Sequence, residues 1–84
     1  MNYKIDFDKK ALKFIMKLPQ DVKTRIFSAI KKLPVEGDIK TIKGYKGFYR
    51  LRVGDYRIIY TIDNDRLIVS VVDAGNRGQI YNRY

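Results

Sequence analysis

The chain has 84 residues and a formal net charge of +9, and it contains neither cysteine nor histidine. This length allows a single domain over residues 1–84 with a modest core. The missing cysteines and histidines exclude disulfides, the usual zinc sites and any histidine general base. The basic excess favours a polyanionic partner, a nucleic acid or an acidic protein, over a solvated surface without a partner. Without a signal peptide or an apolar run of about 18 residues, we expect a cytoplasmic protein that contacts no membrane.

A short strand and two helices are predicted for the first part of the chain. Apolar and polar residues alternate over residues 2–7, which is typical of a strand. Asp8 can cap a helix that continues to about Leu18, and Pro19 separates it from a second helix that ends before Pro34. Each helix has one apolar stripe and one basic face. We therefore expect an antiparallel helical pair that packs through its stripes.

Residues 35–47 are predicted to be a turn-rich connection, with a short strand at residues 39–42 as an option. This segment contains three glycines and three lysines. Lys43 and Lys46 are its candidate substrate-binding residues, because their charge would attract a polyanion.

A β-hairpin is predicted for residues 49–60, where apolar and polar residues alternate on both sides of Gly54-Asp55. A two-residue loop places Arg52 opposite Arg57. The core face then receives the apolar and aromatic side chains, namely Tyr49, Leu51, Val53, Tyr56, Ile58 and Tyr60. The opposite face receives Arg50, Arg52 and Arg57.

A second turn at Asn64-Asp65 extends this hairpin into a meander. That loop places Leu67, Val69 and Val71 opposite Ile62, Tyr60 and Ile58. The predicted architecture is α+β: an antiparallel four-stranded sheet with a β-meander core, an N-terminal strand, and a two-helix hairpin packed on one face. The other face is predicted to be basic and open.

The arginines of the hairpin form the candidate functional site. Like charges directly opposite one another are unfavourable in a sheet, so a bound anion explains them better than solubility does. Arginine presents a planar fork that matches phosphate oxygens. Gly75 is expected to turn the chain sharply and to bring Arg77 beside Arg57, with Tyr81 over the same surface. The alternatives are arginines that merely blunt a sheet edge and a Tyr81 that only packs.

These residues resemble the RelE/ParE superfamily of toxins from toxin–antitoxin modules, and most of all its RelE branch. The similarity is carried by residues 49–60 and by the tail at residues 75–81, in the order strand, helical hairpin, arginine-rich strands and tail. It implies a RelE-like fold over the whole chain. It also implies a cognate RelB-like antitoxin, and binding to DNA only through the complex with that antitoxin.

The resemblance further implies an endoribonuclease that cuts mRNA in the ribosomal A site without a metal or any other cofactor. In this family a ribose 2′-hydroxyl attacks the adjacent phosphate. The matching catalytic positions are Arg50, Arg52, Arg57, Arg77 and Tyr81. Arg57 and Arg77 would hold the phosphate, Arg50 or Arg52 would orient the substrate or assist proton transfer, and Tyr81 would stack on a base or act as the base.

Two departures from the family pattern concern proton transfer. Family members often carry lysines where this chain has Arg50 and Arg52, and some have a histidine at the position of Asn76. They leave open which residue moves protons.

Two other functions also stay open, since a shared fold does not fix the function: a ParE-like inhibitor of DNA gyrase without nuclease activity, and a non-catalytic RNA-binding module.

Overall fold

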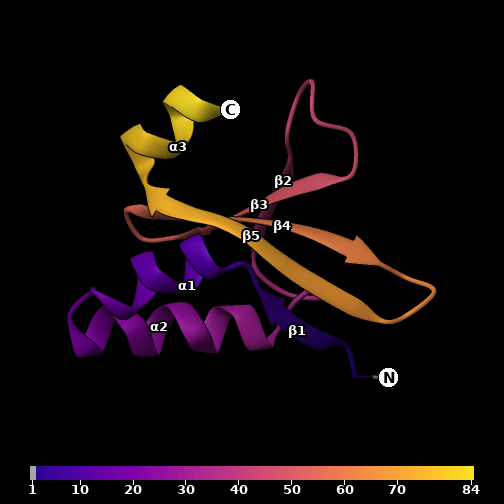
Figure 1. Cartoon of the computed structure of the whole chain (residues 1–84), viewed down its shortest axis with the longest axis horizontal. Coiled ribbons are helices and arrows are strands. Elements are labelled where there is room, and N and C mark those ends of the chain that lie inside the picture. The colour runs from indigo at the N-terminus through magenta and orange to yellow at the C-terminus, as the bar shows by residue number, and fades with distance from the viewer. Residues whose placement is uncertain (1) are drawn as a thin grey trace.

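The computed structural model describes residues 2–84, which form five strands and three helices (Figure 1). In chain order these are β1 (Lys4–Phe7), α1 (Lys9–Met16), α2 (Gln20–Lys31), β2 (Asp38–Thr41), β3 (Phe48–Val53), β4 (Tyr56–Asp63), β5 (Ile68–Asn76) and α3 (Arg77–Arg83). The strands make one sheet in the order β1-β5-β4-β3-β2.

Helices α1 and α2 cover one face of the sheet, as their apolar stripes predict (Figure 1). Ile15 of α1 and Ile26 of α2 are completely buried against Leu51 and Ile58 of the central strands. Asp8 occupies the N-cap of α1 and Pro19 that of α2, so the predicted break between the helices is confirmed. Among the described residues, no helix is both long and apolar enough to cross a membrane.

The hairpin of β3 and β4 has the predicted register. Arg52 pairs with Arg57 and Leu51 with Ile58, on either side of a turn in which Gly54 has φ +57°. Glycine adopts this left-handed conformation readily because it has no Cβ. The apolar face and the arginine face of the hairpin are thus both fixed by one local turn.

The register of the second turn was predicted wrongly. Tyr60 pairs with Val71 and Ile62 with Val69, two residues further along β5 than expected. The loop is longer than two residues because the Asp63 carboxylate accepts hydrogen bonds at 3.1 Å from the backbone N–H groups of Asp65 and Arg66. A register shift beside Ile59 and Tyr60 then changes which residues of β5 face the helices.

Two further features correct the predicted fold class. The sheet is mixed and five-stranded, because β1 joins it by pairing in parallel with β5. The face opposite α1 and α2 is only partly open, because α3 lies over the end of it (Figure 1). Ile59 points to that arginine face and is nevertheless fully buried. The meander and the option of a short strand near residues 39–42 are confirmed in outline.

Replacing Tyr60 by phenylalanine is expected to raise the free energy of unfolding by about 1 kcal/mol at neutral pH. The Tyr60 side chain is fully buried, and its hydroxyl has no hydrogen-bond partner among residues 2–84. Desolvation, aided by Tyr49, raises the pKa of Tyr60 from 10.0 to about 12. Between pH 10 and about pH 12, Tyr60 is deprotonated in the unfolded state but still neutral in the folded state. The free energy of unfolding therefore falls as pH rises through this range. Chemical denaturation at neutral pH and from pH 10 to 12 should show a shallower alkaline decline for the variant.

Candidate phosphate-binding site

A hollow of about 420 Å³ lies on the arginine face of the sheet, at the end covered by α3. The residues that line it are Arg50 and Arg52 of β3, Arg57 of β4, and Arg77, Ile80 and Tyr81 of α3. The hairpin places the first three through its alternating pattern. The five residues that were predicted to form a site are therefore together in space.

Arg77 reaches this hollow through the start of α3 and not through a sharp turn at Gly75. Gly75 continues β5 in register with Arg57. A capping box then starts α3. The Asn76 side chain accepts a hydrogen bond from the backbone N–H of Gln79, and the Gln79 side chain accepts one from the backbone N–H of Asn76, both at 2.9 Å. The backbone N–H of Arg77 donates to the carbonyl of Asp55 at 2.8 Å. This bond fixes the first residue of α3 beside the hairpin turn.

Gly75 serves a different purpose from the predicted one. A Cβ at this position would lie 3.0 Å from the Arg83 guanidinium and 3.2 Å from the side-chain oxygen of Gln79. The missing side chain thus allows α3 to lie close to the strand that precedes it.

The charges of the arginines are compensated unequally. Asp38 of β2 lies 3.6 Å from Arg50 and 3.7 Å from Arg52, whereas Arg57 and Arg77 form no ion pair within residues 2–84. The Arg57 guanidinium instead donates to the carbonyls of Gly54 at 2.9 Å and Tyr56 at 3.0 Å. Two positively charged groups are therefore free to bind an anion.

Burial lowers the pKa of Arg57 below its usual value, and the nearby charges of Arg50, Arg52 and Arg77 lower it further. Folding thus disfavours the charged form of Arg57. The resulting cost in stability is present at neutral pH and would be relieved only as pH rose through the lowered pKa. An anion in the hollow relieves the same repulsion without any change of pH.

Inorganic phosphate is expected to raise the melting temperature of the free protein more than chloride does at equal ionic strength. A ligand that binds only the folded state stabilises it, and phosphate matches the paired donors of arginine. Thermal unfolding followed by circular dichroism measures the difference. In Arg57→Gln the advantage of phosphate should shrink, because one of the two free cations is gone. Equal shifts from the two salts would contradict a phosphate site.

Comparison with known proteins shows the family of the chain. The family model described as the ParE toxin of the type II toxin-antitoxin system parDE matches residues 5–81. Toxin RelE3 of Methanocaldococcus jannaschii is 35% identical over 72 residues, which cover 77% of this chain and 82% of that protein. The chain belongs to the RelE/ParE toxin family.

Solved structures place this RelE-family toxin in the same fold. The archaeal RelE–RelB complex from Pyrococcus horikoshii matches with a TM-score of 0.77 and 25% identity, covering 94% of this chain and 99% of that one. The RelB–RelE antitoxin–toxin complex from Methanococcus jannaschii matches with a TM-score of 0.75 and 30% identity, covering 94% and 98%. The chain is thus a RelE-family toxin of a type II toxin–antitoxin module.

Tyr81 and the two predicted lysines of the toxin are all exposed but differ in the hollow that they line. Tyr81 is 83% exposed, so its ring is open to a ligand from solution. Lys43 lines a second hollow that adjoins the first. Lys46 is exposed in the loop between β2 and β3 and does not belong to the lining of either of these two hollows.

Several residues that shape the site of the toxin were missed by the sequence analysis. Asp38 pairs with two site arginines because β2 lies in register with β3. Asp73 is a buried carboxylate that binds Arg83 of α3. Helix α3 itself had a readable signal, since the spacing of Asn76 and Gln79 is that of a capping box.

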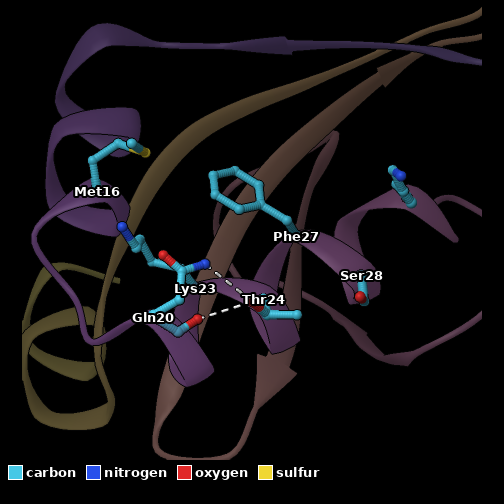
Figure 2. Close-up of a pocket in the computed structure, with 7 residues that line it drawn as sticks. Met16, Gln20, Lys23, Thr24, Phe27 and Ser28 are labelled. Carbon is cyan, nitrogen blue, oxygen red and sulfur yellow. Dashed lines mark hydrogen bonds between the residues drawn. The ribbon is translucent and has the colours of Figure 1, made fainter.

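A further hollow of the toxin, of about 390 Å³, lies on the helices and lacks the features of a chemical site (Figure 2). Gln20 and Thr24 are turned towards each other, and their polar groups form two hydrogen bonds, at 3.3 Å and 2.9 Å. Its other lining groups include Met16, Phe27 and two lysines. The arginine hollow is therefore the better candidate for catalysis.

Proposed function

We propose that this toxin is a ribosome-dependent endoribonuclease that cuts mRNA and so inhibits translation. The observation that carries the proposal is the convergence of four arginines and Tyr81 from two strands and a helix, with two of the arginines unpaired within residues 2–84. A cluster of fixed guanidinium groups stabilises the extra negative charge of a phosphate at the transition state. The toxin would act in the cytoplasm, where mRNA and ribosomes are found.

The reaction is an internal transfer of the phosphate. The ribose 2′-oxygen bonds to the adjacent phosphorus as the hydroxyl gives up its proton, and the bond from phosphorus to the 5′-oxygen of the next nucleotide breaks. That oxygen takes up a proton. The products are a 2′,3′-cyclic phosphate and a 5′-hydroxyl, with no net consumption of water.

Each site residue has a role in this scheme. Arg57 and Arg77 bind the scissile phosphate, and Arg50 and Arg52, held by Asp38, orient the strand. Tyr81 stacks on a base or accepts the proton of the 2′-hydroxyl. The charged Arg57 guanidinium stabilises the negative charge that develops on the phosphate oxygens.

A RelB-like antitoxin is the proposed partner of the toxin. The two structural neighbours are toxin–antitoxin complexes of RelE with RelB. A net charge of +9 favours an acidic partner segment. Binding of the module to DNA would proceed through the antitoxin.

A second function, inhibition of DNA gyrase by binding, is favoured by one observation: the matching family model is that of ParE toxins. The family fold serves both functions, so fold alone does not choose between them. The arginine hollow favours the nuclease, since a pure binder has no evident need of a site for phosphate chemistry.

One comparison of activities tests the proposal. Purified toxin is added to ribosomes programmed with a defined mRNA, and primer extension maps the cuts; in parallel, supercoiling by gyrase is assayed. Cleavage on ribosomes with normal supercoiling is the expected result. Inhibited supercoiling without cleavage would establish the gyrase function instead. Salt-dependent RNA binding without either effect would leave a non-catalytic RNA-binding module.

A further inference from the structure

A second hollow, of about 200 Å³, adjoins the arginine hollow and shares part of its wall. The shared residues are Arg50, Ile80 and Tyr81. The other lining residues are Lys40, Thr41, Ile42, Lys43, Ile59 and Tyr84. The two hollows therefore form one cleft with two compartments between the sheet, α3 and the segment that follows β2.

The chemistry of the second compartment differs from that of the first. Ile59 and Ile80, with exposed fractions of 0% and 4%, and the half-buried Ile42 give it an apolar lining. The exposed residues Lys40 and Lys43 supply positive charge beside that lining. An apolar hollow bordered by cations and joined to a cluster of arginines is suited to a ligand that is apolar at one end and anionic at the other.

Tyr84 provides the aromatic wall of this compartment, and its position is fixed. Its hydroxyl donates to Asp73 at 3.1 Å, while the ring of Tyr45 packs edge-on against it at a centroid distance of 5.0 Å. Burial and the bond to Asp73 raise the pKa of Tyr84 to about 12, so the phenol stays neutral. With its polar end engaged, Tyr84 offers the compartment mainly its ring.

We propose that this compartment binds the nucleobase of a nucleotide whose phosphate lies among the arginines. A nucleotide carries a flat, weakly polar ring and a phosphate on one sugar, which matches two compartments with a common wall. An apolar side chain from a protein partner would fill the lining but would leave the adjoining arginines without an anion. Lys40 and Lys43 would meet the phosphate of a neighbouring nucleotide. The inference rests on the proposed function in one respect, which is that the ligand is taken to be RNA.

Titrations followed by NMR test this assignment with the intact protein and five probes: inorganic phosphate, ribose 5-phosphate, adenosine 5′-monophosphate, uridine 5′-monophosphate and an acidic amphipathic peptide. Phosphate and ribose 5-phosphate should shift the amide signals of Arg57 and Arg77 alone. The nucleotides should also shift those of Ile42, Lys43 and Tyr84. Their affinity should exceed that of ribose 5-phosphate by roughly tenfold, which is the usual gain from stacking one base.

A matched pair of variants separates the base site from general apolar binding. Ile42→Ser should remove the advantage of nucleotides over ribose 5-phosphate and leave phosphate binding unchanged, because the side chain lines only the second of the two compartments. Leu12→Ser, at a partly exposed position on α1, should retain the full advantage. If Ile42→Ser does not fold, the difference in affinity between nucleotides and ribose 5-phosphate on the original chain is sufficient to test the base site.

The possible failures are distinguishable. Nucleotides that bind no better than ribose 5-phosphate, while Arg57 and Arg77 respond to both, would overturn the base site and leave the proposed nuclease standing. Signals of Ile42 and Lys43 that respond only to an acidic amphipathic peptide would also overturn it, in favour of a protein partner. A base-dependent gain in a protein that cuts no mRNA on ribosomes would uphold the base site and count against the proposed nuclease.

Discussion

Replacing either Arg57 or Arg77 by alanine is expected to lower the rate of mRNA cleavage by about a hundredfold or more. These two guanidinium groups lack an ion-pair partner within residues 2–84, so their charge is available to the phosphate at the transition state. Single-turnover cleavage on programmed ribosomes gives the rate. Induced expression in cells should correspondingly cause no growth arrest.

The fold of these two variants should be preserved. The Arg77 side chain is exposed, and loss of the two hydrogen bonds from Arg57 is offset by relief of repulsion within the cluster. Melting temperatures should therefore stay close to that of the original chain. Arg66→Ala is the matched control, because Arg66 is an exposed arginine in the turn after β4. Full cleavage by both site variants would refute the nuclease proposal.

A lysine substitution refines the same test. Arg77→Lys keeps the charge but loses the planar fork that binds two phosphate oxygens at once. We expect a rate between those of the original chain and Arg77→Ala. A rate equal to the original would mean that charge alone matters at this position.

Replacing Arg83 by alanine is expected to cost about 2 kcal/mol and to detach α3 from the sheet. Asp73 is only 4% exposed, and it accepts hydrogen bonds from Arg83 at 3.0 Å and 3.2 Å, from the Tyr84 hydroxyl at 3.1 Å and from the Ala74 N–H at 2.9 Å. Without Arg83, the buried carboxylate loses its closest cation, since Lys10 lies 4.0 Å away. The uncompensated carboxylate of Asp73 then stabilises conformations in which α3 is detached and water reaches the carboxylate.

Hydrogen exchange distinguishes local release of α3 from general destabilisation. In Arg83→Ala the amides of residues 77–83 should lose protection, whereas those at the centre of β3 and β4 should keep most of theirs. Cleavage should fall as well, because Arg77 and Tyr81 lie on α3. In Tyr84→Phe, which removes one neutral donor and keeps Arg83, both effects should be smaller. Uniform loss of protection across the sheet would contradict a local role for Arg83.

Much of the site could be predicted because its strands are local in sequence. The alternating pattern around Gly54 and the left-handed turn at this glycine fix the register of β3 and β4. Both pairing partners lie within a dozen residues of each other, so no distant contact was needed to place Arg50, Arg52 and Arg57 on one face. The tail was harder. Its residues Arg77 and Tyr81 were expected near Arg57, but for the wrong reason, a sharp turn at Gly75.

The errors in the fold arose where distant segments decide the outcome. The second turn is lengthened by the side chain of Asp63, and the register shift beside Tyr60 lets Asp73 pair with Ile59 on the arginine face. Neither the parallel pairing of β1 with β5 nor the ion pairs of Asp38 follow from spacing along the chain. These contacts depend on which strands are neighbours in the folded sheet.

The sequence by itself determined the central hairpin, its two faces and the excess of positive charge, because alternation and turn chemistry act between near neighbours. Only the tertiary structure decided which charges stay free and where the helix that carries Arg77 and Tyr81 lies. Asp38 compensates two of the site arginines, and Asp73 binds Arg83, which holds α3 over the hollow. These ion pairs join residues that are distant in the sequence or in different elements, so they form only when the sheet and α3 have come together.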